Sequence, residues 1–491
     1  MHLNSIRAMR KTDSGQRCFW SRVNEEPFLV ILGILCFAAI VQGQIWDPPA
    51  ISVSPNHNDA AKSRAKRRQL LMDGRLLFKA RFNTLDGAGR PSATGDSKPT
   101  FRTVENNSGF LRTSGPDANS CAACHNQPAI GGSGDFVANV FVGAQFKDPP
   151  TKSITTDITN ERNTITMFGS GAIDMLAREM TRDLIMQRDA GLSKAKATNR
   201  PYPIPLKTKG ISFGAIIVKP DGSYDTSRLE GVDPDLVVKP FGVKGIAISL
   251  REFTINALNH HHGIQAVERF GWEQTGQHDF DSDGVDVEFT VGQVSALVLF
   301  QASLPAAGRS PSFISKHRAE ITRGRQLFET VGCSNCHVPF LKLSTSHFSE
   351  PNPYNRPGNV NPQDVEHPIT LPLPIRPYGG LTRSADGGVL VWAFTDLKRH
   401  RICDEADPFF CNEHIRQDNV PTDQFITTKL WDLATSSPYG HRGDCTTVSE
   451  AIIHHSAEGV SSRNSFLALN ETDKRNLIRF LLSLGTAHHN D

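Results

Sequence analysis

Apolar residues recur at steps of three and four in four segments of the chain, and this spacing predicts amphipathic helices with one buried face. The first of these helices is expected to begin near Gln69 and contains Gly74-Arg75-Leu76-Leu77-Phe78. A second contains Gly324-Arg325-Gln326-Leu327-Phe328, which matches the first pentapeptide at four of five positions. The match indicates that two parts of the chain begin with equivalent helices.

The other two predicted helices also share a pattern. One follows the helix-start candidate Thr290, and the other follows Asn470 or Thr472. Each has a leucine, a phenylalanine and a second leucine at matching spacing: Leu297, Phe300 and Leu304 in one, and Leu477, Phe480 and Leu484 in the other. Chance recurrence is the ordinary explanation for a single helix, but two paired signatures favour a duplicated plan. We therefore expect the opening and closing helices of each copy to pack together.

Strand signals are few and short. The segment ISFGAIIV at 211–218 predicts a strand, and Lys219-Pro220-Asp221-Gly222 directly after it predicts a turn. The stretch PAAGRSP at 305–311 marks a boundary between the two copies. We predict mainly helical domains at 69–310 and 311–491, with long ordered loops and little strand.

The N-terminus has the pattern of an export signal. Residues 1–26 are polar and basic, and residues 28–41 form an uncharged apolar run. This run is too short to span a bilayer comfortably, and Val41-Gln42-Gly43 is an acceptable cleavage site. We expect a signal peptide at 1–43 and a mature periplasmic protein beginning near Gln44. An uncleaved membrane anchor is the alternative.

The charge of the chain adds little to this prediction of fold and function. Charged residues make up 21% of the chain and the formal net charge is +2, which gives no reason to expect nucleic-acid binding. The stretch 44–68 holds several prolines and asparagines and is typical of a linker. It ends in a basic run, Lys62 to Arg68, which we interpret as a solvated face.

The cysteine pattern is the strongest indication of the chemistry of this protein. Four of the nine cysteines fall in Cys121-Ala122-Ala123-Cys124-His125 and Cys333-Ser334-Asn335-Cys336-His337. This order is the attachment pattern of a c-type haem, in which each thiol adds to a vinyl group and the adjacent imidazole binds the iron. A zinc site or a disulfide pair does not need histidine directly after the second cysteine. Among Cys403, Cys411 and Cys445, at most one disulfide and one odd thiol can form.

Both motifs lie among longer stretches that carry a resemblance. These are DANSCAACHNQPAIGGSG (117–134), GAIDMLAREMTRDL (171–184), GVDPDLVVKPFGVKG (231–245), HDFDSDGVDVEFTVGQVSAL (278–297), GCSNCHVP (332–339), EPNPYNRPG (350–358), FTDLKRH (394–400) and SPYGHRGDCTTVSEAIIHHSAEG (437–459). With them, the chain from about residue 70 to 485 resembles the bacterial di-haem oxidoreductases, a peroxidase-like family also labelled thiol oxidoreductase-like. These proteins are distant relatives of di-haem cytochrome c peroxidase and of the maturation enzyme for methylamine dehydrogenase. Where relatives usually read HDGRATTL, this chain reads HRGDCTTV.

The resemblance implies a division of labour between the two haems. In the resembling peroxidases the N-terminal haem reacts, and the C-terminal haem feeds it electrons. The electron-transfer haem takes its distal ligand from a segment before the last helix, which here is 450–455. Alignment puts His455 at the ligand position, with His454 next. For the first haem, the run of histidines at 260–262 is one candidate set, although such a run is usually a solvated or locally bonded loop.

Glu179 is the best candidate for acid–base catalysis, because cleavage of an O–O bond needs a group that moves a proton. Arg178 beside it could stabilise developing negative charge. The ordinary alternative is an ion pair on the surface of a helix.

An aspartate-rich stretch resembles a calcium loop. Asp279, Asp281 and Asp283 alternate along the chain, and Gly284 permits a sharp turn. Position twelve is Thr290 rather than glutamate, so the stretch is not a full EF-hand loop. We expect Ca²⁺ here, and an acidic surface turn is the alternative.

These patterns predict a mainly α protein with two cytochrome c-like haem domains and long loop insertions. Its expected activity is that of a periplasmic di-haem c-type cytochrome oxidoreductase, peroxidase-like, with electron transfer between two covalently bound haems. The expected partners are an exported electron donor, such as a small cytochrome or a cupredoxin, and peroxide or another oxidisable substrate. The alternatives are an electron-transfer cytochrome without catalysis, and an oxidase acting on a partner protein or an organic substrate.

Overall fold

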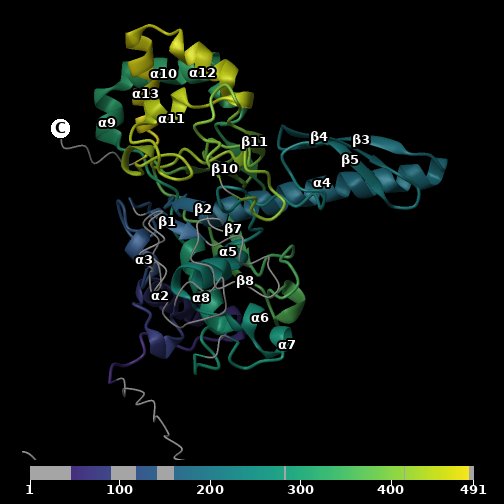
Figure 1. The fold of residues 1–491 in the computed structure, drawn as a ribbon, viewed down its shortest axis with the longest axis vertical. Coiled ribbons are helices and arrows are strands. Elements are labelled where there is room, and N and C mark those ends of the chain that lie inside the picture. The colour runs from purple at the N-terminus through teal and green to yellow at the C-terminus, as the bar shows by residue number, and fades with distance from the viewer. Residues whose placement is uncertain are drawn as a thin grey trace, which may run out of the picture. The chain divides into compact units, whose positions relative to one another are not determined.

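The computed structural model describes residues 46–89, 118–135, 137–140, 160–280, 283–413 and 415–485 (Figure 1). The expected signal peptide at 1–43 lies outside these ranges. The described residues from Pro48 onward belong to one compact unit, with contacts across the expected boundary at 310. Within the described ranges, no helix is both long and apolar enough to cross a membrane.

The opening and closing helices of the first copy pack together. Helix α2 (Arg64–Lys79) begins at Ser63, whose Oγ accepts a hydrogen bond from Lys66 N. Helix α8 (Val291–Ala302) begins after Thr290, which forms a capping box with Gln293. The helices cross at Gly74, where an added Cβ would lie 2.0 Å from the carbonyl oxygen of Ala296. Only glycine allows the backbones to approach this closely.

The second copy repeats this crossing. Helix α10 (Arg318–Thr330) packs on α13 (Glu471–Leu482), which begins after Asn470. An added Cβ at Gly324 would lie 2.0 Å from the carbonyl oxygen of Asn476. Gly324 and Gly74 are the first residues of the matching pentapeptides, so the close contact occurs at equivalent positions. The structure thus confirms the predicted packing of both helix pairs.

A long helix and a three-stranded sheet extend the first half. Helix α4 (Ser170–Thr198) lies along β3 (Tyr202–Thr208) and β4 (Ile211–Val218), and β5 (Tyr224–Leu229) completes the antiparallel sheet in the order β3-β4-β5 (Figure 1). Strand β4 has the predicted bounds, and the turn after it closes with a bond from Gly222 N to Lys219 O.

The expectation of a mainly α fold of two cytochrome c-like domains is wrong, because the described chain is mixed α/β with five antiparallel sheets. The remaining strands are β1 (Val137–Val140), β2 (Asn160–Asn163), β6 (Leu341–Leu343), β7 (His347–Glu350), β8 (Ile369–Pro372), β9 (Leu381–Arg383), β10 (Val389–Val391), β11 (Arg399–Arg401) and β12 (Gln424–Ile426). They pair as β1-β2, β6-β10-β9, β7-β8 and β11-β12. Strands of three or four residues are too short to show the alternation that identifies a strand in sequence.

The expected linker at 44–68 is partly helical. Helix α1 (His57–Lys62) begins after Asn56, whose side chain accepts a bond from Asn58 N, and α2 follows at Arg64. His57 is buried, and its Nδ1 lies 2.9 Å from Ser295 Oγ. The remaining short helices are α3 (Cys121–Cys124), α5 (Leu250–Ala257), α6 (Val267–Phe270), α7 (Trp272–Thr275), α9 (Pro311–Lys316), α11 (Val448–Ile453) and α12 (Val460–Leu467).

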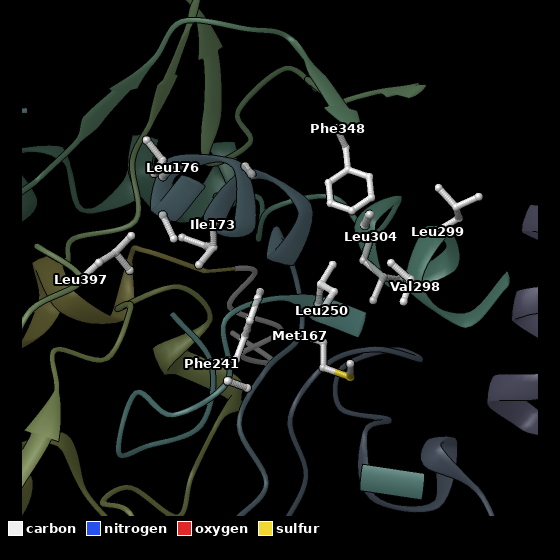
Figure 2. Close-up of a cluster of buried hydrophobic side chains, with 14 of the residues drawn as sticks. Met167, Ile173, Leu176, Phe241, Leu250, Val298, Leu299, Leu304, Phe348 and Leu397 are labelled. Atoms are coloured by element: carbon white, nitrogen blue, oxygen red, sulfur yellow. The ribbon is translucent and has the colours of Figure 1, made fainter. Parts of the chain in front are cut away.

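The main hydrophobic core draws on both halves of the sequence. Figure 2 shows Ile173 of α4 and Val298 of α8 in the same cluster as Phe348 of β7 and Leu397. A second cluster lies around α10 and α13, with Phe328 and Phe480 in contact at 5.4 Å between ring centroids. Because the first core crosses residue 310, the segments that follow the two cysteine motifs are held against each other.

Candidate functional site

The first cysteine motif folds as one helical turn. Ser120 caps α3, because its Oγ accepts a hydrogen bond from Ala123 N at 3.1 Å. His125 follows the helix, and its Nδ1–H donates to the carbonyl of Gly132 at 3.2 Å. Burial lowers the pKa of His125 to about 4, so the ring is neutral at neutral pH. A neutral imidazole with Nδ1 fixed in this way presents Nε2 as a metal ligand.

The second motif is held in the same way. Residues Cys333–Asn335 form a 3₁₀ turn, and the Nδ1–H of His337 donates to the carbonyl of Phe394 at 3.0 Å. Burial, together with the nearby His455, lowers the pKa of His337 to about 4. Both predicted proximal histidines are therefore neutral and oriented by a backbone carbonyl.

Each motif lines its own apolar cavity. The first cavity, of about 170 Å³, is lined by Cys121, Cys124 and His125 together with Phe78 and Leu297 from α2 and α8. The second cavity, of about 330 Å³, is lined by Cys333, Cys336 and His337 together with Phe328 from α10 and Leu481 from α13. All four cysteines are free of disulfide bonds. Two cysteines outside any disulfide and an oriented histidine in each apolar cavity fit a c-type haem. Because the motifs line different cavities, they do not form one four-cysteine zinc site.

His455 lies in the wall of the second cavity. Its Nδ1–H donates to the carbonyl of Ala451 at 2.6 Å, which leaves Nε2 available. His454 instead stacks on Phe409, with 3.6 Å between ring centroids, and is not part of the cavity wall. His455 thus lines the same cavity as His337, and its role as a second axial ligand stays a prediction.

The three histidines at 260–262 lie in the wall of the first cavity, at the end of a π-helical segment Leu258–His262. His262 is fixed by a 2.6 Å bond to Ala118 O, and its Nε2 lies 3.7 Å from Cys121 Sγ. His260 is buried, and its Nε2 has no hydrogen-bond partner among the described residues. The first cavity therefore also has imidazoles close by, so the two sites differ less in available ligands than the sequence alone indicates.

Glu179 and Arg178 lie outside both cavity walls. The carboxylate of Glu179 accepts bonds from Lys209 Nζ at 2.6 Å and from Ser344 N at 2.9 Å. Arg178 donates to Asp174 at 2.6 Å within α4, and also to Ser349 O in β7. These bonds fasten α4 to the second half. A catalytic role for Glu179 and Arg178 stays a prediction that this geometry does not favour.

The two cavities share a polar wall that the sequence did not indicate. Arg162 lines the first cavity and donates two hydrogen bonds to Glu413, at 2.6 and 2.9 Å. His441 lines the second cavity, and its Nε2 lies 3.5 Å from the same carboxylate. Asn163 and Val243 line both cavities. The two motifs are therefore neighbours in space, although more than two hundred residues separate them in sequence.

Cys336, Asp396 and His400 form the one group of potential metal ligands found within the described ranges. His400 Nε2 donates to Asp396 at 2.8 Å, and Nδ1 donates to Glu458 at 2.7 Å. Burial alone would lower the pKa of His400, but the hydrogen bond to Asp396 and the nearby Cys336 raise it to about 11. An imidazolium whose two nitrogens both donate has no lone pair for a metal. This group is better explained as a charged His400 held between two carboxylates next to Cys336.

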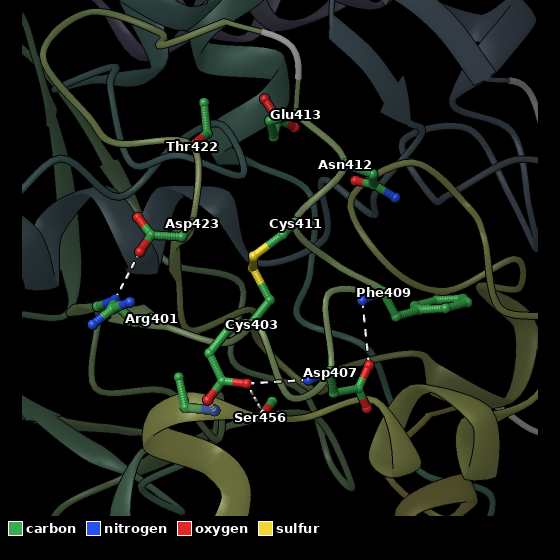
Figure 3. The surroundings of a disulfide bond; sticks show 12 residues. Arg401, Cys403, Asp407, Phe409, Cys411, Asn412, Glu413, Thr422, Asp423 and Ser456 are labelled. Carbon is green, nitrogen blue, oxygen red and sulfur yellow. Dashed lines mark hydrogen bonds and ion pairs between the residues drawn. A yellow bond between two sulfur atoms is a disulfide. The ribbon is translucent and has the colours of Figure 1, made fainter.

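A disulfide supports the segment that carries His455. Cys403 and Cys411 are bonded (Figure 3). Cys445 is a buried free thiol. Ser456 Oγ donates to Asp404 at 2.8 Å, and Ser456 N donates to Ile402 O at 2.9 Å. The bridged loop thus holds the residue directly after His455.

The expected calcium ligands are only partly visible, because Asp281 lies outside the described residues. Asp279 accepts bonds from Asp283 N at 3.2 Å and Gly284 N at 2.9 Å, and Asp283 accepts a bond from Val285 N at 2.8 Å. These carboxylates shape the turn themselves. Calcium binding stays a prediction.

Comparison with known proteins gives no family. No family model matches the chain, and no curated protein matches it. Among solved structures, the chain is similar to hydrazine synthase of Kuenenia stuttgartiensis under xenon pressure, at 13% identity and a TM-score of 0.36, covering 94% of this chain and 100% of that one. A likeness this low transfers no property to this chain, so the site rests on its own geometry.

Proposed function

We propose that the protein is a periplasmic di-haem c-type oxidoreductase of the peroxidase-like kind. The observation that carries this proposal is the repeated site: a CxxC pair that forms no disulfide and a histidine whose Nδ1 is fixed by a backbone carbonyl, in each of two adjacent apolar cavities. Residues with these roles are those that covalent haem attachment requires. The resemblance to di-haem oxidoreductases supports the same proposal.

Cys121 and Cys124 would hold one haem, and Cys333 and Cys336 would hold the other. His125 and His337 would each bind an iron. Bound haem supplies reversible one-electron chemistry and, where an axial position is open, access of peroxide to the iron.

His455 supports the second site as an electron relay. Its free Nε2 lies in the cavity wall near His337, and the disulfide loop holds the neighbouring Ser456. A rigid second imidazole favours electron transfer over reaction with peroxide. We assign the reactive role to the first site, with electrons from an exported small cytochrome or cupredoxin.

Export is supported by the disulfide between Cys403 and Cys411, because such bonds persist in oxidising compartments. The apolar run at 28–41 supports it independently.

An electron-transfer cytochrome is the second candidate, and the histidines in the wall of the first cavity favour it. The spectrum of the oxidised protein, recorded before and after half-reduction and followed by addition of hydrogen peroxide, separates the two. The proposal expects one high-spin haem, at least after half-reduction, that is reoxidised by peroxide. Two low-spin haems in both states, with no reoxidation by peroxide, would establish the carrier instead.

A further inference from the structure

Lys429 is a cation held at a fixed place in the wall of the second cavity. Its backbone segment is pinned on both sides: Thr427 N donates to Lys398 O at 3.0 Å, and Leu430 N donates to Ala393 O at 3.0 Å. Next along the chain, buried Trp431 donates from Nε1 to Trp392 O at 2.6 Å. Lys429 therefore lies in the cavity wall on a segment whose backbone is hydrogen-bonded on both sides of it.

The ammonium group of Lys429 has no hydrogen-bond or ion-pair partner among the residues that the structure describes. The other cations of the same wall do have partners. Arg401 donates to Asp423 at 2.7 Å, and Arg463 lies 3.2 Å from Asp407. His400 lies between two carboxylates. Lys429 differs from all three.

Burial lowers the pKa of Lys429 to about 8, and no neighbouring carboxylate raises it again. The residue is partly buried, and it is one of those that line the cavity. A cation withdrawn from water without a partner costs free energy unless an anion enters beside it. Thus the wall has an unmatched positive charge next to a cavity that already holds the attachment residues.

Lys429 lies close to the boundary between the two cavities. Val243 lines both cavities, and its carbonyl accepts a hydrogen bond at 3.0 Å from the N–H of Ile426, three residues before Lys429. Lys429 therefore lines the second cavity on a segment that is joined to the shared wall.

We propose that Lys429 binds a carboxylate where the two cavities meet, and that this carboxylate is a propionate of a bound haem. The inference rests on the proposed function, because haem carries two propionates and each needs a donor when it is buried. A free carboxylate substrate has the same chemistry, and the experiment separates the two sources.

The test is a spectroelectrochemical titration of the holoprotein, with haem content checked first by intact mass. Lys429→Met and Lys429→Gln remove the charge, whereas Lys429→Arg keeps it. Lys342→Met is the control, because Lys342 is about half exposed and pairs with Asp386 at the surface. Because a positive charge beside a haem disfavours its oxidised form, removing that charge should raise the ratio of oxidised to reduced haem on the order of tenfold.

We expect Lys429→Met and Lys429→Gln to shift at least one haem toward the oxidised form at a fixed applied potential, while Lys429→Arg and Lys342→Met stay near wild type. Added formate should change none of these titrations. Neutral variants that titrate as wild type would overturn the inference. Wild-type titrations that move with formate, while those of the Lys429→Met protein do not, would assign the lysine to a free carboxylate instead. A wild-type chain without covalent haem would overturn the proposed function itself, which is a different outcome.

Discussion

At the scale of single residues, both sites hold imidazoles that backbone carbonyls fix. His125 and His337 have equivalent bonds to Gly132 O and Phe394 O. Each cavity wall also has a further histidine fixed in this way, His262 by Ala118 O in the first and His455 by Ala451 O in the second. The resemblance implies a ligand role for His455 only.

Substituting His455 therefore tests the relay role. We expect His455→Ala to turn the second haem high-spin in the oxidised protein, because its iron loses a rigid nitrogen ligand. His454→Ala is the matched control, since that ring stacks on Phe409 outside the cavity wall, and it should leave the visible spectrum unchanged. A spectral change in the His454→Ala protein alone would reverse the assignment.

Glu179 is expected to act on stability rather than on the reaction. Its carboxylate accepts from Lys209 Nζ and from both the N–H and the hydroxyl of Ser344, so Glu179→Ala leaves these donors without an acceptor. The expected loss is about 1–3 kcal/mol in the free energy of unfolding, measured with denaturant. Glu471→Ala, at an exposed pair on α13, should change it by no more than about 0.5 kcal/mol.

The rate of reaction with peroxide tests the opposite hypothesis, in which Glu179 takes part in catalysis. A Glu179→Gln protein of wild-type stability that reacts much more slowly would show that the carboxylate moves a proton after all. In that case the hydrogen bonds from Lys209 and Ser344 to Glu179 would have to break during turnover.

At the scale of elements, the two helix crossings carry the fold. At Gly74 and at Gly324, an added methyl group would overlap a backbone carbonyl oxygen of the facing helix. Backbone cannot move aside as a side chain can, so we expect Gly74→Ala and Gly324→Ala each to cost about 3 kcal/mol or more in thermal or denaturant unfolding. Gly379→Ala is the comparison, because its nearest neighbour lies at 3.1 Å and its φ is not positive. Equal stabilities for all three variants would contradict the crossing geometry.

The disulfide loop is the second element with a measurable effect. Replacing Cys403 and Cys411 together by serine opens a bridge across 8 positions, which costs about 2–3 kcal/mol in the loop-entropy estimate. Ser456 binds Asp404 of this loop and Ile402 directly before it. Opening the bridge should therefore make the second haem's spectrum more sensitive to mild denaturant than the first. Cys445→Ala leaves the bridge intact and is the control. If both haems lose their spectra together in the doubly substituted protein, the loop does not support His455 specifically.

At the scale of the whole molecule, sequence patterns located the attachment motifs, the paired helices and strand β4. They did so because each signal is local: five consecutive residues, a step of three or four, or a run of β-branched side chains. The short strands and the wall between the cavities were not predictable, because they arise from contacts between segments hundreds of residues apart. Arg162 with Glu413 is one such contact, and Lys429 in the cavity wall is another.

Position in the fold also changed the meaning of residues that sequence had singled out. Glu179 was chosen for its chemistry, but in the structure its oxygens are occupied by donors from β3–β4 and the β6–β7 connection. The histidines at 260–262 resemble a solvated loop in sequence, yet they line the first cavity. Which of two chemically suitable residues reaches a cavity is decided by tertiary packing.

If each cavity holds one covalently attached haem, the intact mass of the denatured protein will show it. The chain should be produced in a host that matures c-type haems, and then extracted with acid and acetone before the mass is recorded. We expect two haem additions on the chain and no haem in the solvent. We also expect one addition in a Cys121→Ala, Cys124→Ala protein and one in a Cys333→Ala, Cys336→Ala protein. Haem released into the solvent, or a wild-type chain carrying fewer than two, would contradict this expectation.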